Sequence, residues 1–316
     1  MSFLSNAHTH TDYCDGVSAI DETLAQARRL GFVSLGFSGH ACQGFDPAYS
    51  MSPDAQQAYF ARLRALQAQS APPRIWAGLE LDALALPSLR EQAFAQADYI
   101  LESTHYLERQ ALGASPAVDG DPLLLKRYVT QRLGGDGLAL ARLYYDIQVE
   151  ALLRDRPHII GHFDLVRKYA RRLGLFDEHG EPYRALACAA LRRARACGAV
   201  LEVNTGAMAR GTMETPYPSL ELLRLWRTLD GDVTVTSDCH DARLLDHGFD
   251  QALALIRQAG FTSLLRLGTG EALWERVAVY RRWVRAKAKP LSFWTGASTA
   301  CRKSPPAAAF CAKTRF

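Results

Sequence analysis

The residues best suited to bind a metal ion begin near the N-terminus, where two histidines are separated by one residue. His8 and His10 flank Thr9. Because side chains alternate faces along an extended strand, both imidazoles are expected on one face, where they could bind one ion. Asp15-Gly16 follows, and a tight turn there can bring an oxygen ligand toward the same place. A single His-x-His motif is short, so its meaning depends on whether distant segments supply matching ligands.

Matching groups recur along the chain, each near the carboxyl end of a predicted apolar strand. The full set is His8, His10, Asp15, His40, Glu80, His105, His162, Asp238 and His240, and it holds six of the nine histidines. Imidazole and carboxylate groups suit Zn²⁺, Fe²⁺ and Mn²⁺, and nine such groups are too many for one ion. The pattern therefore predicts a metal cluster in which a carboxylate such as Glu80 bridges two ions.

Two cysteines adjoin the predicted ligands, and three histidines fall outside the set. Adjacent residues of a strand face opposite ways, so Cys239 is expected to point away from its neighbours and to pack in the interior. Cys14 is likewise interpreted as a packing residue. The remaining histidines are expected to be structural or exposed: His158, His179 and His247.

The predicted ligands require a framework in which several strands end at one edge. Apolar strands are predicted immediately before His8 and over residues 33–37, 75–81, 99–103, 158–162, 199–204 and 233–238, with helical segments between them. This alternation predicts a parallel sheet, and with seven strands the simplest arrangement is a closed β/α barrel. Barrels of this type carry their sites at the carboxyl ends of the strands, where the polar residues fall.

Further elements complete the predicted wall. Long helices are expected over residues 123–153 and 271–285, with residues 263–267 as an extra strand, and residues 110–122 are predicted to form a loop. From about Lys287 the sequence loses its periodicity. The chain is therefore divided into a barrel, 1–286, and a disordered or loosely docked tail, 287–316, with a small partner-docking motif as the alternative for the tail.

Composition narrows the class of protein. The 316 residues are 48% hydrophobic and 22% charged, which is typical of a globular protein. No apolar run is long enough to predict a membrane span, and the N-terminus lacks the pattern of a signal peptide, so a cytoplasmic location is expected. Seven scattered cysteines do not suggest a disulfide framework, and a net charge of +4 gives no reason to expect nucleic-acid binding. Nothing in the sequence indicates an oligomeric state.

The spaced motifs together resemble a known family. The resemblance is carried by His8-Thr9-His10 with Asp15-Gly16, Gly39-His40, Gly78-Leu79-Glu80, Ser103-Thr104-His105, Gly161-His162-Phe163-Asp164 and Ser237-Asp238-Cys239-His240. They are similar in type and order to the motifs of the polymerase and histidinol phosphatase (PHP) superfamily. The resemblance implies a distorted seven-stranded β/α barrel with a trinuclear centre of divalent Zn, Mn or Fe.

The same resemblance implies how the ligands would be shared. His8, His10, Glu80 and Asp238 would hold one ion, Asp15, His40 and His240 a second, and Glu80, His105 and His162 a third. The sequence departs from many histidinol-phosphate phosphatases at one position, because Asp15 stands where they carry a histidine. The change alters the charge at the second ion and leaves the reaction class unchanged.

Within the superfamily the chain is most similar to the histidinol-phosphate phosphatases. The segments 161–169 and 202–219 resemble two of their signatures, and arginines matching Arg167 and Arg210 would bind the phosphate. Guanidinium groups suit this task because their paired donors match phosphate oxygens.

The resemblance implies a phosphoric monoester hydrolase that converts L-histidinol phosphate to L-histidinol and phosphate, a step of histidine biosynthesis, by attack of a metal-bound hydroxide. Asp238 or His240 would orient the hydroxide or protonate the leaving group. One alternative is a PHP phosphoesterase acting on nucleotides or other small phosphate esters. Another is a noncatalytic PHP binding module, which the complete ligand set disfavours. The expected partner is a small phosphate ester.

Overall fold

The computed structural model describes residues 4–109 and 117–279. The predicted loop 110–122 lies partly outside the described residues. The predicted tail, 287–316, lies entirely outside them.

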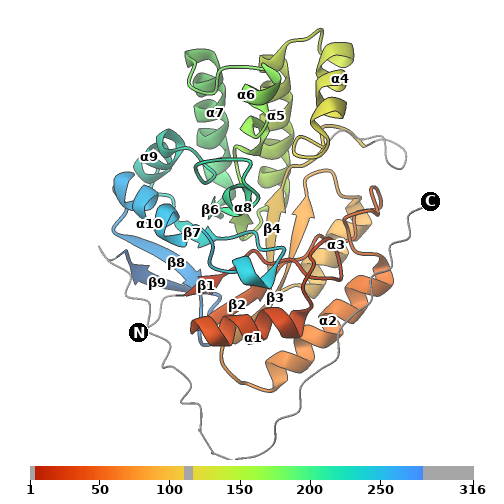
Figure 1. The fold of residues 1–316 in the computed structure, drawn as a ribbon, viewed down its shortest axis with the longest axis vertical. Helices are drawn as coiled ribbons and strands as arrows, with labels where there is room; N and C mark the ends of the chain where they lie inside the picture. Colours follow the sequence, from red (N-terminus) through yellow and green to blue (C-terminus); the bar gives the residue numbers. More distant parts are fainter. Residues whose placement is uncertain (1–3, 110–116, 280–316) are drawn as a thin grey trace, which may run out of the picture. The chain divides into compact units, whose positions relative to one another are not determined.

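The centre of the molecule is a parallel sheet of seven strands that follow one another in chain order (Figure 1). The strands are β1 (Ser5–Asn6), β2 (Ser34–Phe37), β3 (Arg74–Asp82), β4 (Tyr99–Ser103), β5 (Ile159–Ile160), β6 (Val200–Asn204) and β7 (Val233–Thr236). A parallel bridge between Thr9 and Cys239 joins the continuations of β1 and β7, so the sheet curves nearly into a closed barrel. The predicted α/β class, a distorted seven-stranded β/α barrel, is confirmed.

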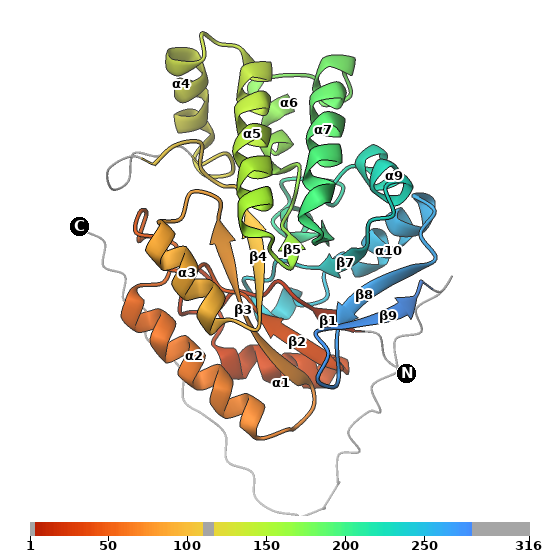
Figure 2. The same cartoon turned by 180° about the vertical axis from the view of Figure 1, so that it is seen from behind.

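Helices connect the strands and cover the sheet. The longer ones are α1 (Ile20–Leu30), α2 (Pro53–Ala68), α3 (Pro87–Gln96), α4 (Pro122–Arg132), α5 (Gly137–Asp155), α7 (Glu181–Ala194), α9 (Leu220–Thr228) and α10 (Phe249–Gln258). Short turns of helix are η1 (Leu165–Arg167), α6 (Ala170–Leu173), η2 (Arg195–Cys197), α8 (Gly206–Ala209) and η3 (Ala242–Leu244). The helices α2 and α3 pack against β3, while α5, α7, α9 and α10 pack in succession along another side (Figure 2).

Two predicted helices are wrong. The stretch 123–153 forms two helices, because Gly134 and Gly135 adopt φ of 61° and 84° and Asp136 then caps α5 through the N–H of Leu138. Within the predicted helix 271–285, the described residues form β9 (Trp274–Ala278), which pairs antiparallel with β8 (Ser263–Leu267). The predicted extra strand at 263–267 is confirmed, and its free edge offers the backbone partners that make a strand of the following segment.

Part of the barrel interior is packed around one tyrosine, Tyr99. Tyr99 is fully buried, and its hydroxyl donates to the carbonyl of Ala7 over 2.7 Å. Two glycines on neighbouring strands make room for the ring: a Cβ at Gly36 would lie 2.3 Å from the Tyr99 hydroxyl, and one at Gly78 would lie 2.3 Å from the ring. The Tyr99 side chain can therefore pack against the backbone of these two strands only because glycine stands at both positions.

Alanine at Gly78 is expected to destabilise the fold. The added methyl group must displace the Tyr99 ring, and overpacking of this kind costs about 1–3 kcal/mol. Urea unfolding of the Gly78→Ala variant measures the loss. A Cβ at Gly270 would meet no described atom within 4 Å, so Gly270→Ala serves as the control. Equal stability of the two variants would contradict this packing.

No helix within residues 4–109 and 117–279 is long and apolar enough to cross a membrane.

Candidate active site and metal centre

The carboxyl ends of the strands bring all nine predicted ligands into one cluster. Glu80 lies at its centre, on β3, with a 2% exposed side chain. Its two oxygens lie 3.0–3.5 Å from ring nitrogens of five histidines: His8, His10, His40, His105 and His162. One carboxylate is therefore shared by imidazoles from four other strand ends.

Asp15 reaches the cluster because the chain folds back sharply after β1. The N–H groups of Cys14 and Gly16 both donate to the carbonyl of Thr11, at 3.0 Å. A Cβ at Gly16 would lie 2.6 Å from the Thr11 nitrogen, so this turn requires glycine. The carboxylate of Asp15 then lies 3.3 Å from a nitrogen of His10 and 3.1 Å from Nε2 of His240.

Asp238 enters the cluster from the end of β7 in a left-handed backbone conformation. Its φ is 47°, in a region that few residues other than glycine, asparagine and aspartate adopt. Oδ1 lies 3.4 Å from Nε2 of His10, and Oδ2 accepts a hydrogen bond of 2.9 Å from Arg210. A Cβ at Gly206 would lie 2.6 Å from Oδ2, so α8 can approach the carboxylate only because glycine stands there.

The cluster contains three groups of donors, with the ligand atoms of each group within 4.8 Å of one another. They are His10, Asp15, His40 and His240; His8, His10 and Asp238; and His40, Glu80 and His105. Relative to the predicted sharing, Glu80 is absent from the group of His8, His10 and Asp238, His10 also joins the second group, and His40 takes the place of His162 beside Glu80 and His105. His162 remains close, with Nε2 3.1 Å from Glu80.

Buried atoms without hydrogen-bond partners indicate that the donor set fits cations. Nε2 of His8, Nε2 of His10 and Oε2 of Glu80 are buried and make no hydrogen bond within the described part of the chain. Nε2 of His8 and Oε2 of Glu80 lie 3.1 Å apart, yet their directions do not suit a hydrogen bond. Such groups are costly unless a partner satisfies them, and a divalent cation is the partner that imidazole nitrogens and carboxylate oxygens share.

The electrostatics of the cluster also favour positive charge. Burial alone would lower the pKa of His8, but the carboxylates of Glu202, Glu80 and Asp238 raise it to about 10. Burial would raise the pKa of Glu80, yet the histidines around it, with His8 first, hold it well below its usual value. The carboxylates therefore stay ionised, and protons on the imidazoles would have to leave when metal binds.

Two carboxylates that the sequence analysis did not select orient His8 and His105 through their Nδ1 atoms. Glu202 on β6 accepts a hydrogen bond of 2.6 Å from Nδ1 of His8, which leaves Nε2 facing the cluster. Asp82 accepts from the backbone N–H of His105 over 3.0 Å and lies 3.3 Å from its Nδ1. Partners of this kind fix the ring orientation of metal-binding histidines. A single charged residue inside an apolar strand was the signal that could have identified Glu202.

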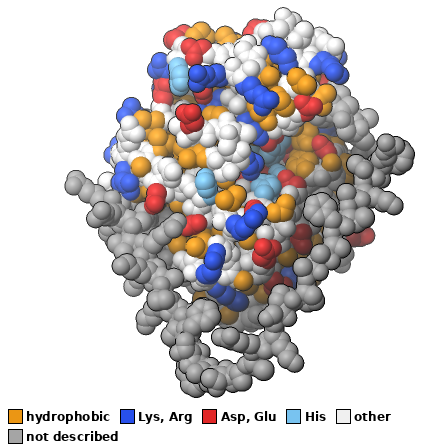
Figure 3. Space-filling model, viewed as in Figure 1, with side chains coloured by type: hydrophobic (Ala, Val, Ile, Leu, Met, Phe, Trp, Pro, Cys, Tyr) orange, Lys and Arg blue, Asp and Glu red, His pale blue; other side chains and the backbone are white. Residues whose placement is uncertain are grey.

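A cavity of about 420 Å³ opens above the cluster, a size suited to a small molecule. Seven of the predicted ligands line it, whereas His8 and His10 lie beneath. The lining also includes Arg210 and groups that the sequence analysis did not select, among them Asp46, Tyr49, Tyr106, Asp119 and Lys168. Histidine side chains are visible in a hollow near the middle of the face in Figure 3.

The two predicted phosphate-binding arginines have different positions. Arg210 lines the cavity from the end of α8. Arg167 does not line it: the side chain is 5% exposed, and Nε lies 2.9 Å from Asp164. Arg167 also donates to the carbonyl of Pro216 over 2.7 Å. Because η1 is a single tight turn, the next residue, Lys168, faces the cavity instead.

The two cysteines beside the predicted ligands, and His158 among the remaining histidines, have the following positions. Cys239 is buried, with Sγ 3.0 Å from the carbonyl of Asp241. Cys14 is half-buried, with Sγ 3.6 Å from Nδ1 of His10, and it belongs to none of the three donor groups. Nδ1 of His158 accepts a hydrogen bond of 3.0 Å from the N–H of Ile100, a structural role.

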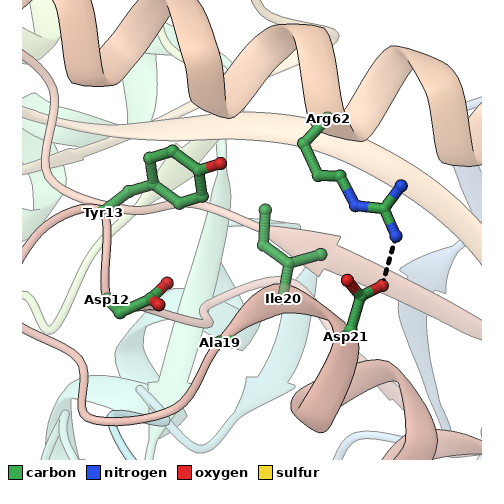
Figure 4. A pocket seen from close by; sticks show the side chains of 6 residues that line it. All are labelled: Asp12, Tyr13, Ala19, Ile20, Asp21 and Arg62. Atoms are coloured by element: carbon green, nitrogen blue, oxygen red, sulfur yellow. Dashed lines mark hydrogen bonds and ion pairs between the residues drawn. The ribbon is translucent and has the colours of Figure 1, made fainter.

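A second cavity, of about 270 Å³, lies at the start of α1 beside α2 (Figure 4). It is lined by Asp12, Tyr13, Ala19, Ile20, Asp21 and Arg62, and an ion pair joins Asp21 to Arg62 at its edge. None of the predicted ligands lines this cavity. Asp12 thus faces away from the cluster that Asp15 joins.

A parallel β/α barrel that gathers imidazoles and carboxylates at the carboxyl ends of its strands has the architecture of a metal-centre barrel protein. Residues 6–206 match the model of the PHP domain, and the chain therefore belongs to the PHP domain family.

Known proteins similar to this chain include one curated relative and two solved structures. A "probable histidinol-phosphatase" of Schizosaccharomyces pombe is 26% identical over 174 residues, which is 55% of this chain and 54% of the relative. The chain thus matches about half the length of that relative. The "putative histidinol phosphatase" of Listeria monocytogenes superimposes with a TM-score of 0.64 at 20% identity, over 78% of this chain and 99% of its own.

The second structure is the histidinol phosphate phosphatase of Lactococcus lactis, which was solved in complex with zinc, L-histidinol and phosphate. It superimposes with a TM-score of 0.62 at 20% identity, over 84% of this chain and 97% of its own. Both structures share the fold of this chain.

Proposed function

We propose that this chain is a metal-dependent phosphomonoesterase and that it hydrolyses L-histidinol phosphate to L-histidinol and phosphate. The observation that carries the proposal is the cluster of nine imidazole and carboxylate side chains, with buried nitrogen and oxygen atoms that make no hydrogen bond, beneath a cavity that Arg210 and Lys168 also line. The names of the similar proteins support the choice of substrate.

The cofactor in this proposal is three divalent cations, drawn from Zn, Mn and Fe, held by the three donor groups with His162 completing the set. When bound, such ions supply charge neutralisation at the phosphoryl oxygens and an activated water molecule. The protein orders the ligands in advance, since Glu202 and Asp82 already hold two of the imidazoles.

The phosphate is held by the cationic side chains of the cavity. Arg210 presents its guanidinium beside Asp238, and Lys168 presents its ammonium from the turn after β5. Arg167, predicted to bind phosphate, acts in this proposal by ordering that turn through its ion pair with Asp164 and its hydrogen bond to the carbonyl of Pro216. Paired N–H donors at Arg210 suit the phosphate oxygens.

Asp238 and His240 are the proposed catalytic residues. Burial would raise the pKa of Asp238, but Arg210 and neighbouring histidines hold it well below its usual value, so the carboxylate stays ionised and can accept a proton from the attacking water. His240 stands at the exposed edge, where Nε2 lies 3.1 Å from Asp15. From there it can help to orient the attacking water or the leaving alcohol oxygen.

Removal of metal tests the proposal directly. Protein stripped with a chelator is expected to lose at least ~100-fold in phosphate release from L-histidinol phosphate, because the transition-state charge is then unbalanced. Adding back Zn²⁺, Mn²⁺ or Fe²⁺ should restore the rate. Circular dichroism checks that the stripped protein stays folded, and full activity in protein that elemental analysis shows to be metal-free would contradict the proposal.

A further inference from the structure

One carboxylate in the cavity has no role in the cluster. Asp119 lines the same cavity as the predicted ligands, and its side chain is 26% exposed. Its backbone carbonyl is held in place by Nζ of Lys168 at 2.9 Å and by the hydroxyl of Tyr169 at 3.1 Å. The carboxylate itself lies 3.6 Å from Nζ of Lys168, beyond hydrogen-bond distance. The backbone is thus anchored while the carboxylate retains its capacity to accept hydrogen bonds.

A negative charge at Asp119 disfavours the binding of phosphate in the cavity. Burial would raise its pKa, but the positive charge of Lys168, with His105 and His162, lowers it below its usual value. The group is therefore ionised, and although it forms an ion pair with Lys168 over 3.6 Å, its negative charge repels the negative charge of an incoming phosphate. This cost is offset if the alcohol half of the substrate brings a cation to Asp119.

The other acidic side chain that lines the cavity outside the cluster is already engaged. Asp46 accepts a hydrogen bond of 2.5 Å from the hydroxyl of Tyr106 and another of 3.3 Å from the N–H of Ala48. Of these two carboxylates, Asp119 is the one with unused acceptor capacity among the described residues.

We propose that Asp119 is a substrate-recognition residue that accepts hydrogen bonds from an ammonium group on the alcohol half of the phosphate monoester. The inference rests on the proposed function and assigns a residue that recognises the amino-alcohol half of its substrate. L-Histidinol phosphate carries such an ammonium group next to the esterified carbon. A charged pair in a partly desolvated cavity gives both affinity and selectivity.

A purely structural role for Asp119 predicts a different effect of its substitution on the hydrolysis of phosphate esters. If Asp119 served only to position Lys168, its loss would weaken every phosphate ester alike, since Lys168 faces the phosphate. The main bond of Lys168 is to the backbone carbonyl of Asp119, which substitution of the side chain retains.

The test compares two substrates across a small set of variants. The substrates are L-histidinol phosphate and the analogue in which hydrogen replaces the amino group. For metal-loaded Asp119→Asn and Asp119→Ser, kcat/KM for the amino ester is expected to fall roughly 10- to 100-fold, the range for loss of a charged hydrogen bond. For the analogue, which brings no cation to Asp119, kcat/KM should not fall, because loss of the carboxylate removes a repulsion and no attraction. Asp121→Asn, which removes a charge two residues away and keeps the helix cap, is the control and should leave the ratio unchanged.

The outcomes separate the inference from the function on which it rests. An equal loss for both esters, or no loss for either, would overturn the role of Asp119 while leaving the phosphatase intact. If metal-loaded wild-type protein hydrolyses neither ester, the proposed function itself fails. Calorimetric binding of L-histidinol gives a readout without turnover: the affinity is expected to fall by the same factor in both variants, and unchanged affinity would contradict the inference.

Discussion

Replacement of Glu80 by glutamine is expected to remove most of the bound metal and to lower kcat/KM for phosphate release by at least ~10³-fold. Glu80 is the one carboxylate, among the described residues, whose oxygens lie within 3.5 Å of five imidazoles. An amide offers one neutral oxygen and directs an N–H₂ group at nitrogens that need a cation. Elemental analysis of the purified variant and a phosphate-release assay measure the two effects.

A second buried glutamate provides the control. Glu102 on β4 is 1% exposed and belongs to none of the donor groups. Burial, with the charge of Asp155, raises its pKa well above the usual value, which favours the protonated form. Glu102→Gln keeps a group of similar shape outside the donor groups and should keep metal and activity. Near-normal metal content and turnover in the Glu80 variant would eliminate the bridging role.

The second large effect is expected at Arg210. Arg210→Ala should lower kcat/KM about 100-fold with metal content retained, because the variant loses paired donors to the phosphate and the 2.9 Å hydrogen bond that holds Asp238. Arg210→Lys keeps the charge without the planar geometry and should recover only part of the loss. Steady-state kinetics separate a rise in KM from a fall in kcat.

An exposed arginine that follows the next strand, β7, is the matched control. Arg243 has an 82% exposed side chain paired with Asp241, so Arg243→Ala should change kcat/KM by less than about 2-fold. If the two alanine variants behave alike, Arg210 does not contact the phosphate.

The clustering of the nine predicted ligands could be predicted because its signal is local. Histidines and acids that directly follow an apolar strand lie at one end of a parallel barrel whatever the loops between them do. Asp15 was predictable for a related reason, since the glycine after it marks the turn that folds back onto Thr11. The strands were found within one or two residues because each is short, apolar and followed by a polar residue.

The remainder of the site depends on contacts that sequence spacing does not encode. Glu202 contacts His8 across 194 positions, and only the register of β6 brings them together. Arg167 and Lys168 are adjacent, and which of them faces the cavity depends on the geometry of one tight turn. The strand β9 forms because β8 offers it a free edge, a tertiary effect that overrides the helical pattern of its sequence.

The central claim is tested most directly by the substrate preference of the metal-loaded protein. The measurement is kcat/KM for phosphate release from L-histidinol phosphate and from a panel of nucleotides and sugar phosphates. The account predicts that L-histidinol phosphate is preferred by at least ~100-fold. The carboxylate of Asp119 attracts the ammonium group of this ester and disfavours esters that lack a cation. An equal or higher value for a nucleotide or sugar phosphate, or no hydrolysis of any ester, would contradict it.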